Sequence, residues 1–247
     1  MRANQRIIRI TLIFLILVAL AAWIYAIFPL NKITGSYKCP DCNVIIISLT
    51  NVGAEHLGAY GYYRGTSPNI DKFAEESIVF ENAFTPASWT LPAGMSLFTS
   101  LYPFTHGVMN RFNENKIDSD TITLVDILKE NGYKTAAFTG GFDYDSKFGL
   151  TNRFDVISSG EEHVIDKNEN NIIPWIGSLV SSAPAALEWV KNNQDKKFFL
   201  FVQGYDVHCP FTPPKPYDRL FDPEYNNSVD YSLCLWTFDR TSPFFID

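Results

Sequence analysis

The 247-residue sequence has no internal repeat and no low-complexity tract, so nothing in it indicates a repeat architecture. Charged residues are also few, at 19%, whereas hydrophobic residues make up 46%. A disordered chain shows the opposite balance. The length suffices for one sizeable α/β domain with a terminal appendage, and the composition predicts that this domain is globular.

Cysteines are scarce, and their spacing argues against a four-cysteine zinc site. The four are Cys39, Cys42, Cys209 and Cys234. Only one close pair is present, whereas such a site needs two. A redox-active CxxC motif usually opens a helix after a strand, but Cys39-Pro-Asp-Cys42 precedes an apolar run that we expect to be a strand. We therefore expect a short-range disulfide in a compartment outside the cytoplasm.

Acidic residues are missing from the first 38 positions, which contain five basic ones. Within this segment Ile7 to Leu30 is almost continuously apolar, and as a helix it is long enough to span a bilayer. Arg2, Arg6 and Arg9 precede or enter the run, so we expect the N-terminus to stay cytoplasmic. The predicted organisation is a single-pass transmembrane anchor at 1–30, a linker with the CxxC motif at 31–42, and an exported, extracytoplasmic domain at 43–247.

A cleaved signal peptide is the alternative interpretation of the N-terminal segment. Ala19-Leu20-Ala21 would supply a cleavage site of small residues. The apolar run continues well past these alanines, which favours an uncleaved anchor. Both interpretations export the remainder of the chain.

The net charge of −7 conceals a strongly acidic main domain. Beyond position 38 the sequence has 15 basic residues against 27 acidic ones. Such a domain is a poor candidate for nucleic-acid binding. We therefore expect a membrane partner through the N-terminal helix and no nucleic-acid partner.

Apolar runs alternate with amphipathic segments and predict a layered α/β domain with a largely parallel sheet. The predicted strands are Asn43–Leu49 (a run suited to burial on both sheet faces), Ile78–Phe84, Lys134–Thr139 and Lys197–Gln203. The predicted helices are Ile70–Ser77, Thr121–Asn131 with Gly132 at its end, and Ser178–Gln194, interrupted or begun afresh at Pro184. A polar stretch at 158–171 is predicted to be an exposed loop.

Two polar positions follow from this layout as candidate ligand sites. Thr50 and Asn51 come directly after the first strand, at the edge where open α/β sheets bind ligands. Thr90 lies two residues before Pro92, at the predicted start of a helix. The N–H groups and positive potential of such an end suit a nucleophile that attacks an anionic ester. The alternative is that Thr90 is a simple N-cap.

Several blocks of sequence occur in the order of a known family. They are Asn43-Val-Ile-Ile-Ile-Ser-Leu49, Glu55-His-Leu-Gly-Ala-Tyr-Gly-Tyr62, Thr66-Ser-Pro-Asn-Ile-Asp71, Phe80-Glu-Asn-Ala83, Trp89-Thr-Leu-Pro92, His106-Gly-Val108, Gly132-Tyr-Lys-Thr-Ala-Ala137 and Asp206-Val-His-Cys-Pro210. From about Asn43 to Pro216 the chain resembles the sulfatase branch of the alkaline phosphatase superfamily. The resemblance implies a mostly parallel sheet with helices on both faces.

The resemblance also implies metal-dependent cleavage of a small anionic ester, or of a glycan- or lipid-type ester, through a covalent intermediate. The metal would be a divalent cation such as Ca²⁺, Mg²⁺, Mn²⁺ or Zn²⁺. Thr90 stands where sulfatases have the cysteine or serine that becomes formylglycine, so we expect no formylglycine and infer phosphoester chemistry. His208 matches the histidine that contacts the ester oxygens or leaving group. His106 could serve packing or catalysis.

Departures from the family pattern concern the charged groups of the site. Thr50 and Asn51 stand where metal-binding aspartates are usual, and they retain only neutral oxygens. Ala93 and Gly94 replace a serine and an arginine or histidine. Two milder departures are Glu55, for an aspartate, and Ser100, for a glycine.

Three hypotheses remain open. The first is a membrane-anchored pseudoenzyme that keeps the fold and has lost or impaired catalysis. The second is an active hydrolase or transferase that uses Thr90, with Asp143, Asp145 or Asp206 as substitute metal ligands, although each could equally be a solvated loop carboxylate. The third is a fragment of a longer enzyme, because we find no later metal-ligand pair. It would be truncated at the C-terminus, with an unpaired sheet edge and exposed apolar groups such as Trp236 and Phe244–Ile246.

Overall fold

The computed structural model describes residues 13–20, 39, 41–111, 115–140, 142–159, 178–208, 213 and 215–224. The chain divides into two compact units, Met1–Cys42 and Asn43–Asp247. In the first unit residues 13–20 are helical, and the predicted disulfide joins Cys39 to Cys42. Within the described ranges no helix has both the length and the apolar character that a membrane crossing requires. Most of the predicted anchor, at 1–12 and 21–30, lies outside those ranges.

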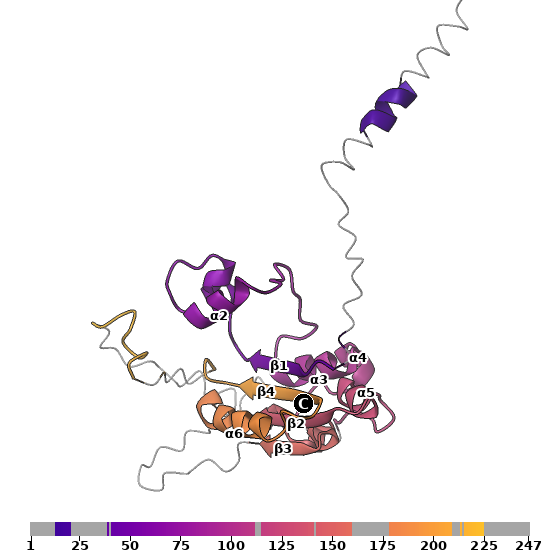
Figure 1. Ribbon diagram of the computed structural model, residues 1–247, viewed down its shortest axis with the longest axis vertical. Coiled ribbons are helices and arrows are strands. Elements are labelled where there is room, and N and C mark those ends of the chain that lie inside the picture. Colours follow the sequence, from indigo (N-terminus) through magenta and orange to yellow (C-terminus); the bar gives the residue numbers. More distant parts are fainter. Residues whose placement is uncertain are drawn as a thin grey trace, which may run out of the picture. The chain divides into compact units, whose positions relative to one another are not determined.

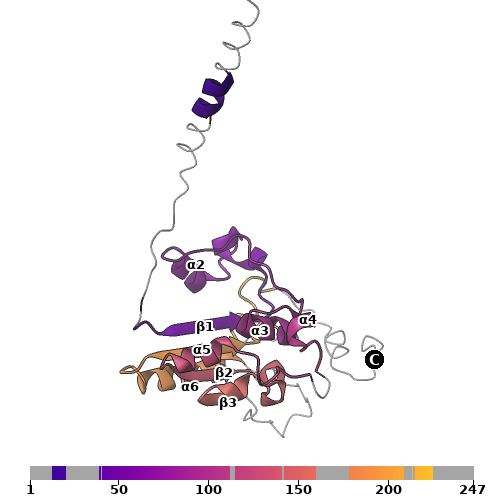
Figure 2. The same cartoon turned by 90° about the vertical axis from the view of Figure 1, so that its right-hand side faces the viewer.

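The second unit contains a four-stranded parallel sheet in the order β1-β4-β2-β3. The strands are β1 (Val44–Leu49), β2 (Lys134–Thr139), β3 (Val156–Ser159) and β4 (Phe198–Gly204). The helices are α2 (Pro68–Ala74), α3 (Thr90–Thr99), α4 (Pro103–His106), α5 (Leu124–Glu130) and α6 (Leu179–Lys191). Short 3₁₀ turns lie at Ala54–His56, Gly58–Tyr60, Phe142–Tyr144, Ser146–Phe148 and Thr151–Arg153. Helices α3 and α5 cover one face of the sheet and α6 the other, which confirms the predicted α/β class (Figures 1 and 2).

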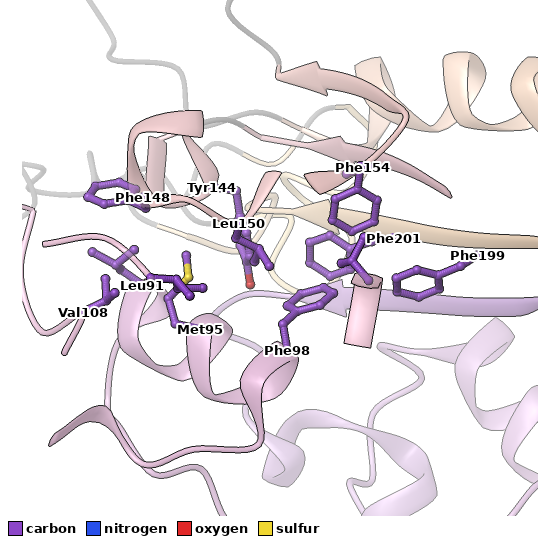
Figure 3. Packing of buried hydrophobic residues seen from close by; sticks show 13 residues of the cluster. Leu91, Met95, Phe98, Val108, Tyr144, Phe148, Leu150, Phe154, Phe199 and Phe201 are labelled. Carbon is purple, nitrogen blue, oxygen red and sulfur yellow. The ribbon is translucent and has the colours of Figure 1, made fainter. Parts of the chain in front are cut away.

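The alternation of side chains along β4 divides the core into two clusters. Phe199 and Phe201 face α3, where they pack with Phe98 and other buried groups (Figure 3). Phe198, Leu200 and Val202 face α6 instead. All seven residues of β4 are buried, so β4 is the central strand around which the domain is built.

Strand β1 is less buried than its sequence predicts. Val44 and Ile46 pack against the main cluster, but Ile45 and Ile47 are 51% and 66% exposed. The prediction of burial on both faces is wrong, because β1 ends the described part of the sheet and α6 lies over β4 and β2.

The segment Ile78–Phe84 is not a strand, although its composition predicts one. It pairs with none of the described strands, and Ile78, Phe80 and Phe84 are largely exposed. The high β propensity of this segment is therefore not sufficient to form a strand, because no described strand lies beside it to pair with. Conversely, β3 was not predicted, and its last residues fall in the expected loop at 158–171. It forms because Val156–Ser159 pairs with Ala136–Thr139 of β2. Residues 160–171 lie outside the described part of the chain.

Helix boundaries follow local capping signals. The Thr123 side chain and Asp126 form a reciprocal capping box that starts α5, and Gly132 follows the helix with a φ of +81°. Helix α6 starts after Ser178, whose hydroxyl accepts from the N–H of Val180. It continues unbroken through Pro184, so the expected interruption there is wrong. Pro184 has no N–H, so the helix lacks only the hydrogen bond that this position would donate to the Val180 carbonyl.

Candidate functional site

A cavity lies between the carboxyl end of β1 and the N-terminal half of α3. Thr50, Asn51 and Thr90, which the sequence singles out, all line this cavity. Two elements far apart in the sequence thus bring the predicted residues together. The described lining residues are Ser48–Val52, Phe84–Thr90, Ala93, Gly94, Ser96, Leu97, Ser100–Tyr102 and Tyr144. They do not include His208.

The cavity wall is uncharged. None of the lining residues that the structure describes is an aspartate, glutamate, lysine, arginine or histidine. The polar groups are hydroxyls, above all those of Thr50, Thr90 and Ser96, together with the amide of Asn51. The wall can therefore donate and accept hydrogen bonds, but it offers no ionic partner to an anion or a cation.

Thr90 is the first residue of α3 and is half-buried. The N-cap position belongs to Trp89, which makes no side-chain cap hydrogen bond. The simple N-cap interpretation of Thr90 is therefore wrong. Leu91, Met95 and Phe98 hold the helix against the core (Figure 3), so its positive N-terminal end is fixed at the cavity.

Thr50 and Asn51 continue from β1 into the cavity. The Thr50 N–H donates to the carbonyl of Gly204 at 3.0 Å, and the Thr50 hydroxyl accepts from Nε2 of Gln203 at 2.6 Å. Asn51 is exposed and has a φ of +65°, a left-handed conformation that asparagine tolerates better than most residues. A turn of this kind presents Asn51 to solvent and Thr50 to the sheet.

A half-buried ion pair lies beside Trp89 and Tyr144, two residues of the cavity wall. Arg111 donates two hydrogen bonds to the carboxylate of Asp143, from Nε at 2.6 Å and from Nη2 at 3.0 Å. Asp143 is 1% exposed and also accepts from the hydroxyl of Tyr205 at 3.3 Å. The guanidinium lies over the ring of Trp89, 5.1 Å from its centroid. Asp143 is therefore not a solvated loop carboxylate, and its oxygens are already engaged.

The other two candidate aspartates have local structural roles. Asp206 accepts hydrogen bonds from the Ser178 hydroxyl and, at 2.9 Å, from the Leu179 N–H, so it caps α6. Asp145 accepts from the Lys147 N–H at 2.9 Å at the start of a 3₁₀ turn. Neither lines the cavity.

The two histidines that the sequence analysis singled out, His106 and His208, differ in role. Nδ1 of His106 accepts from the Val108 N–H at 3.1 Å, so the proton of the neutral ring is on Nε2, 3.1 Å from the Ser96 hydroxyl. Burial lowers the pKa of His106, which outweighs hydrogen bonding to the backbone. The ring thus links α4 to α3 as a packing residue. His208 follows β4, and its ring meets the Tyr205 ring edge-on with centroids 5.7 Å apart.

Gly94 cannot carry the basic side chain that the family pattern leads one to expect. A Cβ at this position would overlap the hydroxyl of Tyr144. Tyr144 is itself 2% exposed and packs its ring against Phe201, and burial raises its pKa. The ring therefore occupies the space that a longer side chain would need.

The described residues do not fit a divalent cation. Hard cations prefer several anionic oxygens, but Thr50 and Asn51 are neutral and the nearby Asp143 is paired with Arg111. In the described part of the chain no three histidine, cysteine, aspartate or glutamate side chains are grouped to hold a metal. We therefore derive no reaction step through a metal.

Sequence reasoning missed Tyr144, which lines the cavity, and three residues that do not line it, namely Gln203, Tyr205 and Arg111. One signal was available. Gln203 and Tyr205 continue the alternating side-chain row of Phe199 and Phe201. Two polar residues at the end of such an apolar row indicate that the end of the strand lies near a polar site. The partnership of Arg111 with Asp143, 32 residues apart, had no such signal.

Comparison with known proteins identifies relatives over most of the chain. Residues 42–232 match the sulfatase family. An N-acetylgalactosamine-6-O-sulfatase of Bacteroides thetaiotaomicron is 32% identical over 96 residues, which are 38% of this chain and 19% of the relative. The ulvan-active sulfatase of Formosa agariphila is 24% identical over 206 residues, which are 74% of this chain and 39% of the relative.

Solved structures agree on the fold. The phosphonate monoester hydrolase of Agrobacterium radiobacter superposes with a TM-score of 0.56 at 22% identity, covering 76% of this chain and 45% of that chain. A member of the alkaline phosphatase superfamily from Vibrio parahaemolyticus gives a TM-score of 0.56 at 22% identity, covering 79% and 47%. The chain thus spans less than half the length of these relatives.

Proposed function

Because the chain belongs to the sulfatase family, we propose that residues 43–247 form a sulfuric- or phosphoric-ester hydrolase domain with impaired turnover. One observation carries the proposal: the described residues that line the cavity are all uncharged. Preorganised charge is usually the largest contribution to stabilising the transition state of such reactions. A neutral wall can hold an ester but lacks that contribution.

The substrate we propose is an anionic ester on a glycan- or lipid-type molecule. The names of two relatives, an N-acetylgalactosamine-6-O-sulfatase and an ulvan-active sulfatase, support the glycan. The anionic group would lie at the N-terminal end of α3, beside Thr90, where backbone N–H groups and the helix dipole favour negative charge.

A second candidate function is residual phosphoester hydrolysis with Thr90 as the nucleophile. It is favoured by the position of Thr90 in the cavity wall at a helix start. The Thr90 oxygen would bond to phosphorus as the bond to the leaving alcohol breaks, with the hydroxyl proton released to solvent and the alcohol protonated from solvent. Water would then hydrolyse the threonine phosphoester. His208, beside Tyr205, stays a predicted contact of the leaving group.

We also propose that the N-terminal segment anchors the domain on the outer side of a membrane. Residues 13–20 are helical, and their large apolar side chains are at least half exposed. The Cys39–Cys42 disulfide is consistent with an oxidising compartment. Extraction of membranes with alkaline carbonate should leave the full chain in the pellet and release a variant without residues 1–30. Release of both would contradict anchoring.

Impairment is tested by cation binding and turnover of the full chain in detergent. Thermal unfolding would be followed with Ca²⁺, Mg²⁺, Mn²⁺ and Zn²⁺, with Asn51→Ala as the matched variant. A cation that binds the native state must raise the melting temperature. Turnover of p-nitrophenyl sulfate and p-nitrophenyl phosphate would be compared with Thr90→Ala.

The outcomes separate the two candidate functions. Impairment predicts a cooperative transition that no cation shifts, and turnover at most slightly above that of Thr90→Ala. A cation shift that Asn51→Ala removes, together with rapid turnover that Thr90→Ala abolishes, would overturn impairment and support full catalysis. Slow turnover of the phosphate ester that still depends on Thr90 would support the second candidate.

A further inference from the structure

Strands β1 and β4 direct two polar side chains to the same place. Val44 and Ile46 of β1 pack into the core cluster under α3, and Thr50 continues their alternating row. Gln203 lies on the same face of β4, the strand that pairs with β1. Thr50 lines the cavity, whereas Gln203 is 0% exposed. A buried amide therefore lies next to a hydroxyl of the cavity wall.

Thr50 is held to β4 at two points. Its N–H donates to the carbonyl of Gly204 at 3.0 Å, which fixes the backbone. Its Oγ1 accepts from Nε2 of Gln203 at 2.6 Å, which fixes the side chain. With both points held by neighbouring residues of one buried strand, the Thr50 hydroxyl has a defined position at the cavity.

This arrangement leaves the hydroxyl proton of Thr50 for another acceptor. A threonine hydroxyl has one proton and two lone pairs, and the bond from Gln203 uses one lone pair. Among the described residues Thr50 makes only the two hydrogen bonds given above, and neither uses that proton. Because the amide N–H points at the oxygen, the O–H must point away from the amide. Thr50 is therefore a hydrogen-bond donor in the wall of the cavity.

Gln203 is an unfavourable choice for packing alone. Its Oε1 is buried and has no hydrogen-bond partner in the part of the chain that the structure describes. A buried acceptor without a partner lowers stability. A methionine has a similar length and would fill the site without a polar oxygen. The bond to Thr50 gives the glutamine a role at the cavity that an apolar side chain cannot supply.

We propose that Thr50 binds the tetrahedral anion of the ester, and that Gln203 is the positioning residue that keeps Thr50 a donor. The Thr50 hydroxyl donates to a non-bridging oxygen of the sulfuric or phosphoric ester. The inference rests on the proposed binding of an anionic ester at this cavity. Since the described wall has no cationic side chain, fixed neutral donors must attract the anion there. Hydrogen bonds to charged groups are stronger than those between neutral groups.

The contribution of Gln203 is preorganisation. Without the amide, the Thr50 hydroxyl is free to rotate, and binding of the anion must then fix it. Groups that are held in the bound orientation beforehand avoid this cost. Loss of Gln203 should therefore weaken anion binding only as long as Thr50 keeps its hydroxyl.

The test measures anion binding by the full chain in detergent. Inorganic phosphate and inorganic sulfate are titrated by calorimetry into the wild type, Thr50→Val, Thr50→Ser, Gln203→Met and the double variant of Thr50→Val with Gln203→Met. Thr139→Val is the matched control, because Thr139 also ends a parallel strand but is not among the lining residues of the cavity. Unfolding midpoints and turnover of p-nitrophenyl phosphate are measured for each variant.

The inference predicts that Thr50→Val weakens binding of both anions about tenfold or more, whereas Thr50→Ser and Thr139→Val leave it nearly unchanged. Gln203→Met should weaken binding about threefold or more, and in the double variant it should add nothing to the loss from Thr50→Val. For the ester, KM should rise in Thr50→Val and Gln203→Met with kcat nearly unchanged.

Stability separates positioning from a structural role of Gln203. Gln203→Met should unfold at the same temperature as the wild type or higher, because the substitution removes the unpartnered buried oxygen. A glutamine that only supports the fold would show the reverse, a lower unfolding midpoint with unchanged anion binding, and that result would overturn the inference.

Further outcomes distinguish this inference from the proposed function. A wild type that binds neither anion, or binding that Thr50→Val leaves unchanged, would overturn the role of Thr50. Additive losses in the double variant would overturn positioning by Gln203. Unchanged binding in Thr50→Val together with turnover that depends on Thr90 would leave the proposed function standing. Binding that depends on Thr50, without turnover above that of Thr90→Ala, would support the inference and overturn the second candidate function.

Discussion

Gly94 lies against the hydroxyl of Tyr144, and this contact decides what position 94 can hold. The sequence marks the residue only as a departure from the family pattern. The structure supplies a physical reason, because the ring of Tyr144 is buried and cannot move aside freely. Position 94 thus lacks a basic side chain, and the Tyr144 ring occupies the space that such a side chain would need.

We expect Gly94→Ala to destabilise the domain by about 1 kcal/mol in urea unfolding. Overpacking typically costs about 1–3 kcal/mol, and the higher helix propensity of alanine offsets about 1 kcal/mol of that. Adding Tyr144→Phe should relieve part of the loss. Gly65→Ala is the control, since a Cβ there meets open space. A Gly94→Ala protein as stable as the wild type would contradict the packing argument.

Ser100 ends α3 in the left-handed conformation, with a φ of +57°. This explains why glycine is usual at the position, since glycine adopts such angles without steric cost. Ser100→Gly should raise the free energy of unfolding by about 0.5–1 kcal/mol, the strain relieved less the added entropy of the unfolded chain. Ser77→Gly, at an exposed position after α2, is a comparison that should not stabilise. Destabilisation by Ser100→Gly would refute the argument.

At the scale of elements, α5 is held at its start by Asp126. The carboxylate accepts from the Thr123 N–H at 2.8 Å and pairs with Arg153 at 2.5 Å. Burial alone would raise the pKa of Asp126, but hydrogen bonds from Thr123 and Arg153 outweigh it and hold the pKa below its usual range. The free energy of unfolding therefore depends on pH through the protonation of Asp126.

The sign of this dependence follows from proton binding. The unfolded chain takes up the proton near pH 4, and the folded domain only at lower pH, so the stabilisation is complete above pH 4 and is lost as pH falls through the folded value. We expect Asp126→Asn to cost about 1 kcal/mol at pH 7 and much less near pH 2, measured by urea unfolding. Glu130→Gln, exposed on the same helix, should show little difference. An equal loss at both pH values would argue against linkage.

At the scale of the whole molecule, β1 leaves apolar surface bare in the described structure. Ile45 and Ile47 project from a strand that ends the described sheet. Free edges with apolar faces promote association between chains.

We therefore expect Ile47→Lys to reduce self-association, measured by light scattering of the full chain in detergent across a concentration series. The melting temperature should change little, because the side chain is 66% exposed. Lys134→Arg, at an exposed position on β2, is the control. Scattering that is the same for Ile47→Lys and the wild type would show that this face does not drive association.

Family membership and fold class could be predicted from the sequence. Ordered motif blocks and apolar runs depend on residues close together in the chain, so they predicted a parallel α/β domain of the sulfatase family. The predicted strands at 43–49, 134–139 and 197–203 match β1, β2 and β4 to within one residue at each end. The same local logic predicted that Thr50, Asn51 and Thr90 lie at strand and helix ends, where the cavity is found.

Only the tertiary structure decided which neighbours these residues have. Among the described residues, the strand order leaves β1 half bare and pairs no strand with Ile78–Phe84, although both segments have the composition of buried strands. Asp143 meets Arg111 and Tyr205 across 32 and 62 residues of chain. Periodicity records which side of its own element a residue occupies, whereas pairing across elements depends on how the chain folds back on itself. The sequence therefore determined the family and the placement of Thr50, Asn51 and Thr90 at the ends of elements, and the packing of β4 against α3 determined which residues surround them.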